Sequence, residues 1–111
     1  MKPPPPIEIL GLVAGFAIWS SAFVSLYAVH GGACDGGWFA RQETIRVVLA
    51  VILALHLLLH AALCFWLWGR AKEKTVPSVF FLRTATFVLA LAAAGATLWT
   101  SAPVFILRVC G

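Results

Sequence analysis

The sequence predicts an all-α membrane protein that crosses a bilayer three times. The chain of 111 residues contains three long uncharged stretches, Ile9 to Val29, Val47 to Trp68 and Thr84 to Leu107. Each provides the ~20 apolar residues that a helix needs to span the hydrocarbon core. The composition, with 62% hydrophobic and 11% charged residues and a mean hydropathy of +0.99, is far from that of a soluble domain. We therefore expect a single three-helix transmembrane domain over residues 1–111.

The first span directly follows an N-terminal tail. Residues 1–6 form a Pro-rich tail, in which Pro3 to Pro6 favour an extended, polyproline-like strand and delay the helix until Ile7. The span itself covers Ile9 to Val29. We expect the helix to end at Gly31-Gly32, because paired glycines weaken a helix.

Short polar segments frame the second and third spans. Arg41 to Arg46 leads into the second span, which ends at Gly69-Arg70. A charged link follows and Pro77 closes it, so that Ser78 is expected to be the N-cap of the third span. Connections this short leave no room for a separate soluble domain.

The distribution of lysine and arginine predicts the orientation of the chain. By the positive-inside rule, the side with more of these cations faces the cytoplasm. Five cations fall on one side and three on the other: Lys2, Arg70, Lys72, Lys74 and Arg83 against Arg41, Arg46 and Arg108. We expect a cytoplasmic N-terminus and a periplasmic C-terminus, in a multi-pass protein of a bacterial inner membrane.

The chain has three cysteines, and the expected topology brings two of them to the same side. Cys34 lies in the outer loop and Cys110 at the C-terminus, in an oxidising compartment where disulfides persist. We expect a Cys34–Cys110 disulfide that holds the end of the third span near the outer loop; two unrelated thiols are the alternative. Cys64 lies within the second span and is interpreted as a small buried hydrophobic residue.

Small residues and one tryptophan predict where helices pack closely. Gly11 and Gly15 form a GxxxG pattern, which allows two membrane helices to approach each other. Trp19 lies about halfway along the first span, where its indole N–H needs a partner. The predicted helix-packing residues are Gly11, Gly15, Trp19, Ser21, Ser25 and Gly95. The alternative is that Ala and Gly are simply common in membrane helices.

One group of residues inside the membrane has possible chemistry. His56, His60 and Cys64 are spaced four residues apart and share one side of the second span. Histidines at i and i+4 can share a metal ion, so His56 and His60 are candidate ligands for copper or haem b. One ion cannot bind all three residues, because His56 and Cys64 are about 12 Å apart along the helix axis. The simpler interpretation has no metal and no cofactor: both imidazoles bond to carbonyl groups or to Ser and Thr hydroxyls of a neighbouring helix.

Haem ligation by two histidines places a further demand on the chain. The two imidazoles must come from different helices and face each other across the porphyrin. The remaining histidine is His30, which lies about 14 Å from the depth of His56. Haem binding would therefore need a second subunit or a second copy of the chain.

The sequence does not indicate catalysis or nucleic-acid binding. The four acidic residues, Glu8, Asp35, Glu43 and Glu73, lie outside the spans, and no serine or cysteine nucleophile has an adjacent base. The net charge of +4 comes from cations at the ends of apolar stretches, where they anchor helices at lipid headgroups. We expect a protein that is not an enzyme.

Scattered positions in the spans and the outer loop form a further pattern: Trp19, Phe23, Tyr27-Ala28-Val29-His30, Cys34, Gly37-Trp38, Leu98-Trp99-Thr100 and Cys110. The pattern resembles small uncharacterised three-span membrane proteins of proteobacteria, which are often encoded beside haem-copper terminal oxidases such as cytochrome c oxidase. The resemblance implies an accessory or assembly role near a respiratory electron-transfer complex and carries over no active site. We expect a non-catalytic accessory subunit whose partners are a larger integral membrane complex and lipids. A haem- or copper-binding redox or assembly protein that uses His56 and His60 is the alternative.

Overall fold

Three long helices dominate the structure. The computed structural model describes residues 6–36 and 41–106, and residues 1–5, 37–40 and 107–111 lie outside this description. The helices are α1 (Pro6–Gly36), α2 (Gln42–Ala71) and α3 (Pro77–Ile106). The predicted all-α fold, with three helices long and apolar enough to cross a membrane, is confirmed.

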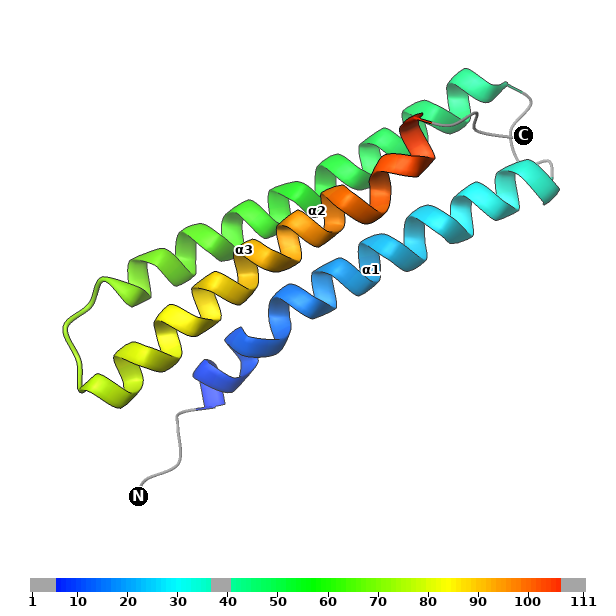
Figure 1. The fold of residues 1–111 in the computed structure, drawn as a ribbon. Helices are drawn as coiled ribbons and strands as arrows, with labels where there is room; N and C mark the ends of the chain where they lie inside the picture. The colour runs from blue at the N-terminus through cyan, green and yellow to red at the C-terminus, as the bar shows by residue number, and fades with distance from the viewer. Residues whose placement is uncertain (1–5, 37–40, 107–111) are drawn as a thin grey trace.

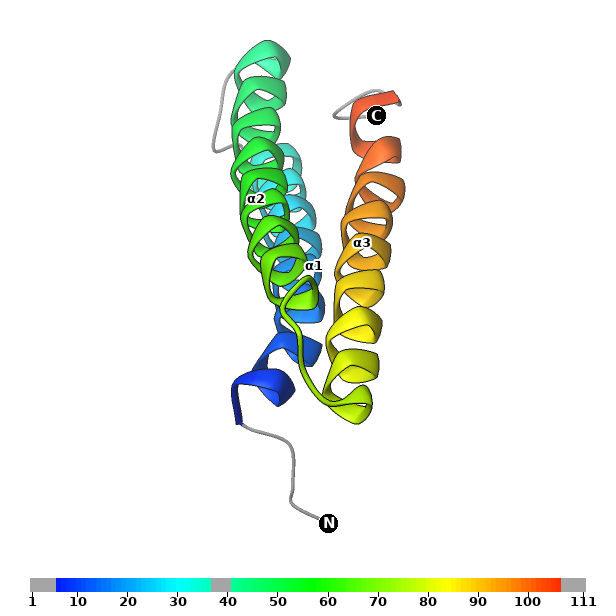
Figure 2. The ribbon, with the colours of Figure 1, turned by 90° about the vertical axis from the view of Figure 1, so that its left-hand side faces the viewer.

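The helices form an elongated bundle in which each helix contacts the other two. Figure 1 shows that α2 runs antiparallel to α1 and α3, so that α1 and α3 are parallel. In both views the beginning of α1 and the end of α3 lie at opposite ends of the bundle (Figures 1 and 2). An odd number of membrane crossings requires this arrangement.

The burial pattern is the reverse of that in a soluble helical bundle. Large apolar side chains point outwards, and Phe65 and Trp99 are both 82% exposed. Many of the buried residues are small or polar: Ala22, Ala33, Ala90, Ala93, His60, Thr86, Thr97 and Ser101. A bundle surrounded by lipid is expected to look like this, because small residues let helices approach and polar groups bond between them.

The C-terminal half of α1 differs from the sequence prediction. The helix continues through Gly31-Gly32 as far as Gly36, so the prediction of a break at this glycine pair is wrong. A glycine inside a helix costs only about 1 kcal/mol. Burial of the next turn offsets this cost, because Ala33 is 2% exposed and belongs to an apolar cluster with Leu26 and Leu49.

The starts of α2 and α3 also lie earlier in the chain than the predicted spans. α2 begins at Gln42. α3 begins at Pro77, and proline is favoured at the first position of a helix because an N–H there would have no partner within the helix. The Phe80 N–H donates to the Val76 carbonyl at 3.0 Å, so Val76 caps the helix and Ser78 does not.

α1 and α3 approach each other closely between the N-terminal third of α1 and the middle of α3. Gly11 and Gly15 are buried there. A Cβ atom on Gly15 would lie 3.1 Å from Ala93 Cβ and 3.4 Å from Ala90 Cα, and one on Gly11 would lie 3.1 Å from Thr86 Cγ2. The GxxxG pattern therefore faces α3 of the same chain.

Candidate functional site

Polar side chains of all three helices lie between this glycine contact and the apolar cluster around Leu26. We call them the polar core: Trp19 and Ser21 of α1, His56 and His60 of α2, and Thr97 and Thr100 of α3. His60 and Thr97 are buried in the bundle, and Ser21 lies at its exposed edge.

His60 is the most deeply buried member of the polar core, with 1% of its surface exposed. Its Nε2 atom lies 2.7 Å from Thr97 Oγ1, and the Thr97 hydroxyl donates to the Ala93 carbonyl at 3.0 Å. Because this bond uses the hydroxyl proton of Thr97, its oxygen accepts from His60. His60 therefore carries a proton on Nε2. Its Nδ1 atom is buried and has no hydrogen-bond partner among the described residues.

His56 adopts the opposite tautomer, one turn of α2 away. Its Nδ1 atom lies 2.7 Å from the Ile52 carbonyl, which can only accept, so the proton is on Nδ1. The Nε2 atom then accepts from the Ser21 hydroxyl of α1 at 3.1 Å. Three of the four ring nitrogens of the two histidines thus have protein partners, of the kinds that the sequence led us to expect.

Trp19 joins α1 to α3. Its indole N–H donates to Thr100 Oγ1 at 3.3 Å, and the Thr100 hydroxyl donates to the Ala96 carbonyl at 2.8 Å. The Tyr27 hydroxyl donates to the Thr100 carbonyl at 2.8 Å. The partner that the half-buried Trp19 indole of α1 needed is therefore a threonine of α3.

The hydroxyl residues of α3 are site residues that the sequence pattern did not single out. Each donates to a carbonyl one turn earlier in its own helix: Thr86 to Leu82, Thr97 to Ala93, Thr100 to Ala96 and Ser101 to Thr97. This local bond leaves the oxygen free to accept from another helix. The threonines within an otherwise apolar span could have indicated these hydrogen bonds. Their partners, however, depend on the orientation of each helix about its own axis.

The predicted histidine and cysteine stripe does not converge. Cys64 has a free thiol and is partly exposed. Within residues 6–36 and 41–106, no three His, Cys, Asp or Glu side chains lie close enough to hold a metal ion. Ser21 of α1 is level with His56, so His30 stands nine residues further along, about 14 Å away.

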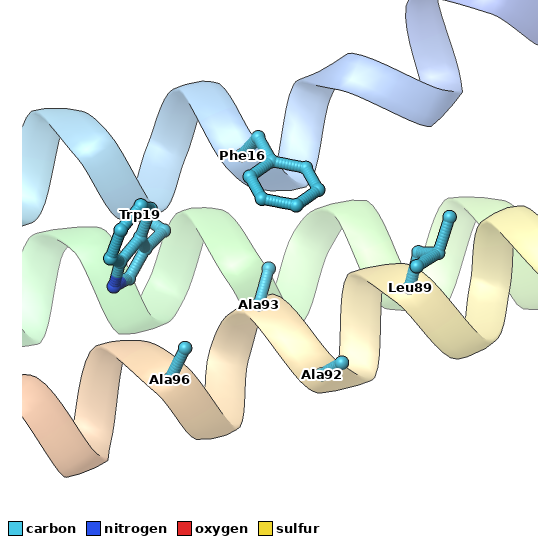
Figure 3. A pocket seen from close by; sticks show the side chains of 6 residues that line it. All are labelled: Phe16, Trp19, Leu89, Ala92, Ala93 and Ala96. Atoms are coloured by element: carbon cyan, nitrogen blue, oxygen red, sulfur yellow. The ribbon is translucent and has the colours of Figure 1, made fainter.

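A groove lies on the outside of the bundle between α1 and α3. It has a volume of about 210 Å³ and is lined by Phe16, Trp19, Leu89, Ala92, Ala93 and Ala96. Figure 3 shows the two aromatic rings on α1 opposite the alanine side chains of α3. The alanines leave the space open, and the aromatic rings border it on the α1 side.

The other predicted packing and disulfide residues lie in different places. Ser21 is exposed, Ser25 is half-buried, and Gly95 is exposed with no atom within 4 Å of a Cβ position. Cys34 packs against the apolar cluster around Leu26. Cys110 lies outside the described residues, so the Cys34–Cys110 disulfide stays a prediction.

Comparison with models of protein families, with curated proteins and with solved structures finds no match for this chain. The geometry of the bundle and the sequence pattern are therefore the basis for a proposed function.

The Trp19–Thr100 bond leads to a testable prediction. Trp19→Phe removes the indole donor but keeps an aromatic ring beside Phe23, whose centroid lies 6.0 Å away. We expect the free energy of unfolding to fall by about 0.6 kcal/mol, the average for a hydrogen bond between membrane helices. Trp99→Phe, at an 82% exposed position, is the matched control and should change it less. Equal losses from the two substitutions would contradict a stabilising role for this bond.

Proposed function

We propose that the protein is a non-catalytic accessory subunit that packs against a larger integral membrane complex. One observation carries this proposal: the outward face of α3 has a stripe of small residues. Ala92 and Gly95 are exposed, Ala96 is half-buried, and a Cβ atom on Gly95 would meet nothing within 4 Å. Small residues on a lipid-facing helix allow another helix backbone to approach closely.

The groove between α1 and α3 supports the same proposal. Ala92 and Ala96 belong both to the stripe and to the groove, and Phe16 and Trp19 stand on the other side. A side chain from a neighbouring helix can enter between the aromatic rings and the alanines. The stripe and the groove together form one continuous surface, which we call the α3 docking face.

The polar core supports a structural role for the histidines rather than a redox role. A haem or copper ligand needs a ring nitrogen with a free lone pair that faces the metal. His56 Nε2 accepts from Ser21, and the lone pair of His60 Nδ1 is enclosed in the bundle. Haem b or copper bound by His56 and His60 would require these side chains to rearrange, so this alternative is less favoured.

The sequence pattern supports a specific partner complex, an orientation in the membrane and a disulfide. The resemblance to three-span proteins encoded beside terminal oxidases supports a respiratory electron-transfer complex, such as cytochrome c oxidase, as the partner. The excess of cations near the α2–α3 turn supports a cytoplasmic N-terminus and a periplasmic C-terminus in a bacterial inner membrane. In this orientation the α1–α2 loop and the C-terminus are in the periplasm, where a Cys34–Cys110 disulfide can form.

Affinity purification in mild detergent tests the proposal. Gly95→Leu places a bulky side chain on the α3 docking face without an internal clash, and we expect it to reduce the recovery of the partner complex at least tenfold, which corresponds to about 1.4 kcal/mol. Gly69→Leu is the matched control, because Gly69 on α2 also has open space at its Cβ position. Equal recovery with the two variants, or no co-purifying complex with the native chain, would refute the proposal.

An absorption spectrum and a metal analysis of the purified chain separate the two functions. We expect a colourless, metal-free protein. A Soret band that disappears in His56→Ala or His60→Ala would instead favour the haem carrier.

A further inference from the structure

We propose that a second groove, at the α2–α3 turn, binds one anionic glycerophospholipid. Its phosphate would lie at Lys72 and an acyl chain would lie along the aromatic wall. The groove is lined by Trp68, Ala71, Lys72, Phe80, Thr84 and Phe87. Its volume of about 540 Å³ is within the range of sites that bind small molecules. It lies where α2 ends and α3 begins, and it shares no lining residue with the α3 docking face.

The walls of this groove suit a hydrocarbon chain. The rings of Trp68 and Phe87 pack against each other with centroids 5.2 Å apart. This contact joins α2 to α3. Phe80 is 51% exposed and Trp68 is 47% exposed. These rings form an apolar surface between two helices, in which an acyl chain gains contact on more than one side.

The mouth of the groove is positively charged. Arg70, Lys72, Lys74 and Arg83 lie near the turn, and Glu73 is the single acidic residue from position 70 to position 83. The Glu73 carboxylate pairs with the Arg83 guanidinium at 3.3 Å, and Arg83 also donates to the Arg70 carbonyl at 3.2 Å. The acidic residue of this segment is thus paired within the chain, and residues 70–83 keep a net charge of +3.

Lys72 lies at a position where it can bind a lipid phosphate. Its ammonium group lies 5.4 Å from the centre of the Trp68 ring, and its stem lines the groove. Cations beside tryptophans at the end of a membrane helix lie at the level of the headgroups. Basic pockets between membrane helices at this level recognise anionic headgroups. The aromatic wall begins beside this cation, so a lipid whose phosphate lies at Lys72 can place an acyl chain against Trp68 and Phe87.

This combination of charge and apolar surface determines the class of ligand. A zwitterionic phospholipid presents an ammonium or choline group near its phosphate and is attracted less to a net positive turn. Inorganic phosphate has the charge but makes no use of the Trp68–Phe87 wall. An anionic phospholipid such as phosphatidylglycerol satisfies both features.

Native mass spectrometry of the full chain, released from detergent micelles, tests the site. Phosphatidylglycerol and phosphatidylcholine with the same acyl chains are titrated separately, and we expect one phosphatidylglycerol to bind more tightly. Lys72→Gln should weaken this binding about fivefold, the effect of one cation at the membrane surface. Arg46→Gln removes the same charge at the far end of α2 and should leave the affinity unchanged. An excess of inorganic phosphate should not displace the lipid.

A second pair of variants tests the apolar wall without a change in charge. Ala71→Phe fills the groove and should weaken phosphatidylglycerol binding, whereas Ala62→Phe, at an exposed position on α2, should not. Circular dichroism checks that each variant keeps its helices. Equal affinity for the two lipids, equal effects of the Lys72 and Arg46 variants, or displacement by phosphate would each overturn the proposal. Because none of these measurements includes a partner complex, they are independent of the accessory-subunit proposal.

Discussion

Gly15→Leu is expected to lower the free energy of unfolding by about 2–3 kcal/mol, at the upper end of the range for overpacked sites. A Cβ atom at this position already comes within 3.1 Å of Ala93 Cβ and 3.4 Å of Ala90 Cα. The second of these atoms belongs to the backbone and cannot rotate away. A leucine therefore forces α1 and α3 apart over several turns, which also weakens the contact at Gly11.

Unfolding in mixed micelles with a rising fraction of denaturing detergent, followed by circular dichroism, measures this effect. Gly95→Leu is the matched control, because it makes the same change at a helical glycine whose Cβ position is open. The control should keep or slightly raise the stability, since leucine is a better helix former than glycine by nearly 1 kcal/mol. Gly15→Leu should therefore destabilise the isolated chain, whereas Gly95→Leu should leave it at least as stable and should weaken partner binding. Similar stabilities would show that the α1–α3 contact tolerates a larger separation.

The second large effect is expected at the buried His60–Thr97 pair. His60→Ala removes a fully buried side chain and leaves a cavity between the helices, so we expect a loss of about 2–4 kcal/mol. His56→Ala is the comparison. His56 is only half-buried and its partner Ser21 is exposed, so the loss there should be smaller.

A double-mutant cycle isolates the hydrogen bond from the packing. Thr97→Val keeps the shape of the side chain but leaves the His60 Nε2–H without an acceptor, which should cost about 1–2 kcal/mol. In His60→Leu the donor is absent, so the added change Thr97→Val should cost much less. The same unfolding assay measures both steps. Additive losses would mean that the 2.7 Å contact contributes no net stability.

Much of the architecture followed from the distribution of charge along the chain. Three uncharged stretches predicted three helices, because a bilayer interior admits few other backbone structures. The four-residue spacing predicted His56 and His60 on one side of α2; in the structure His56 bonds to α1 and His60 bonds to α3. The helix ends were less predictable. Gly31-Gly32 looked like a break, but local propensity is a weak constraint when the next turn, at Ala33, is buried.

The pairing between helices could not be predicted from the sequence. Gly11 and Gly15 indicated a close contact, but a GxxxG pattern does not say whether the partner helix is in the same chain. The choice of Thr97 for His60, and of Thr100 for Trp19, depends on the rotation and relative height of two helices that are far apart in sequence. These are properties of the assembled bundle, and the pattern within a single span carries no information about them.

The length of the helices has a consequence for the kind of bilayer that the protein fits. At 1.5 Å per residue, 30 residues of α2 extend about 45 Å, which is roughly 15 Å longer than a typical hydrocarbon layer. The polar ends of α2 account for much of this excess, because Gln42 to Arg46 and Arg70 need not lie in the hydrocarbon. Arg46 and Arg70 stand 24 residues apart, about 36 Å, so their long side chains can reach opposite surfaces of a layer of ordinary or somewhat greater thickness. In a markedly thinner bilayer, α2 would have to tilt or the lipids around it would have to form a locally thicker bilayer. Local membrane thickness alone would therefore bias where the protein accumulates.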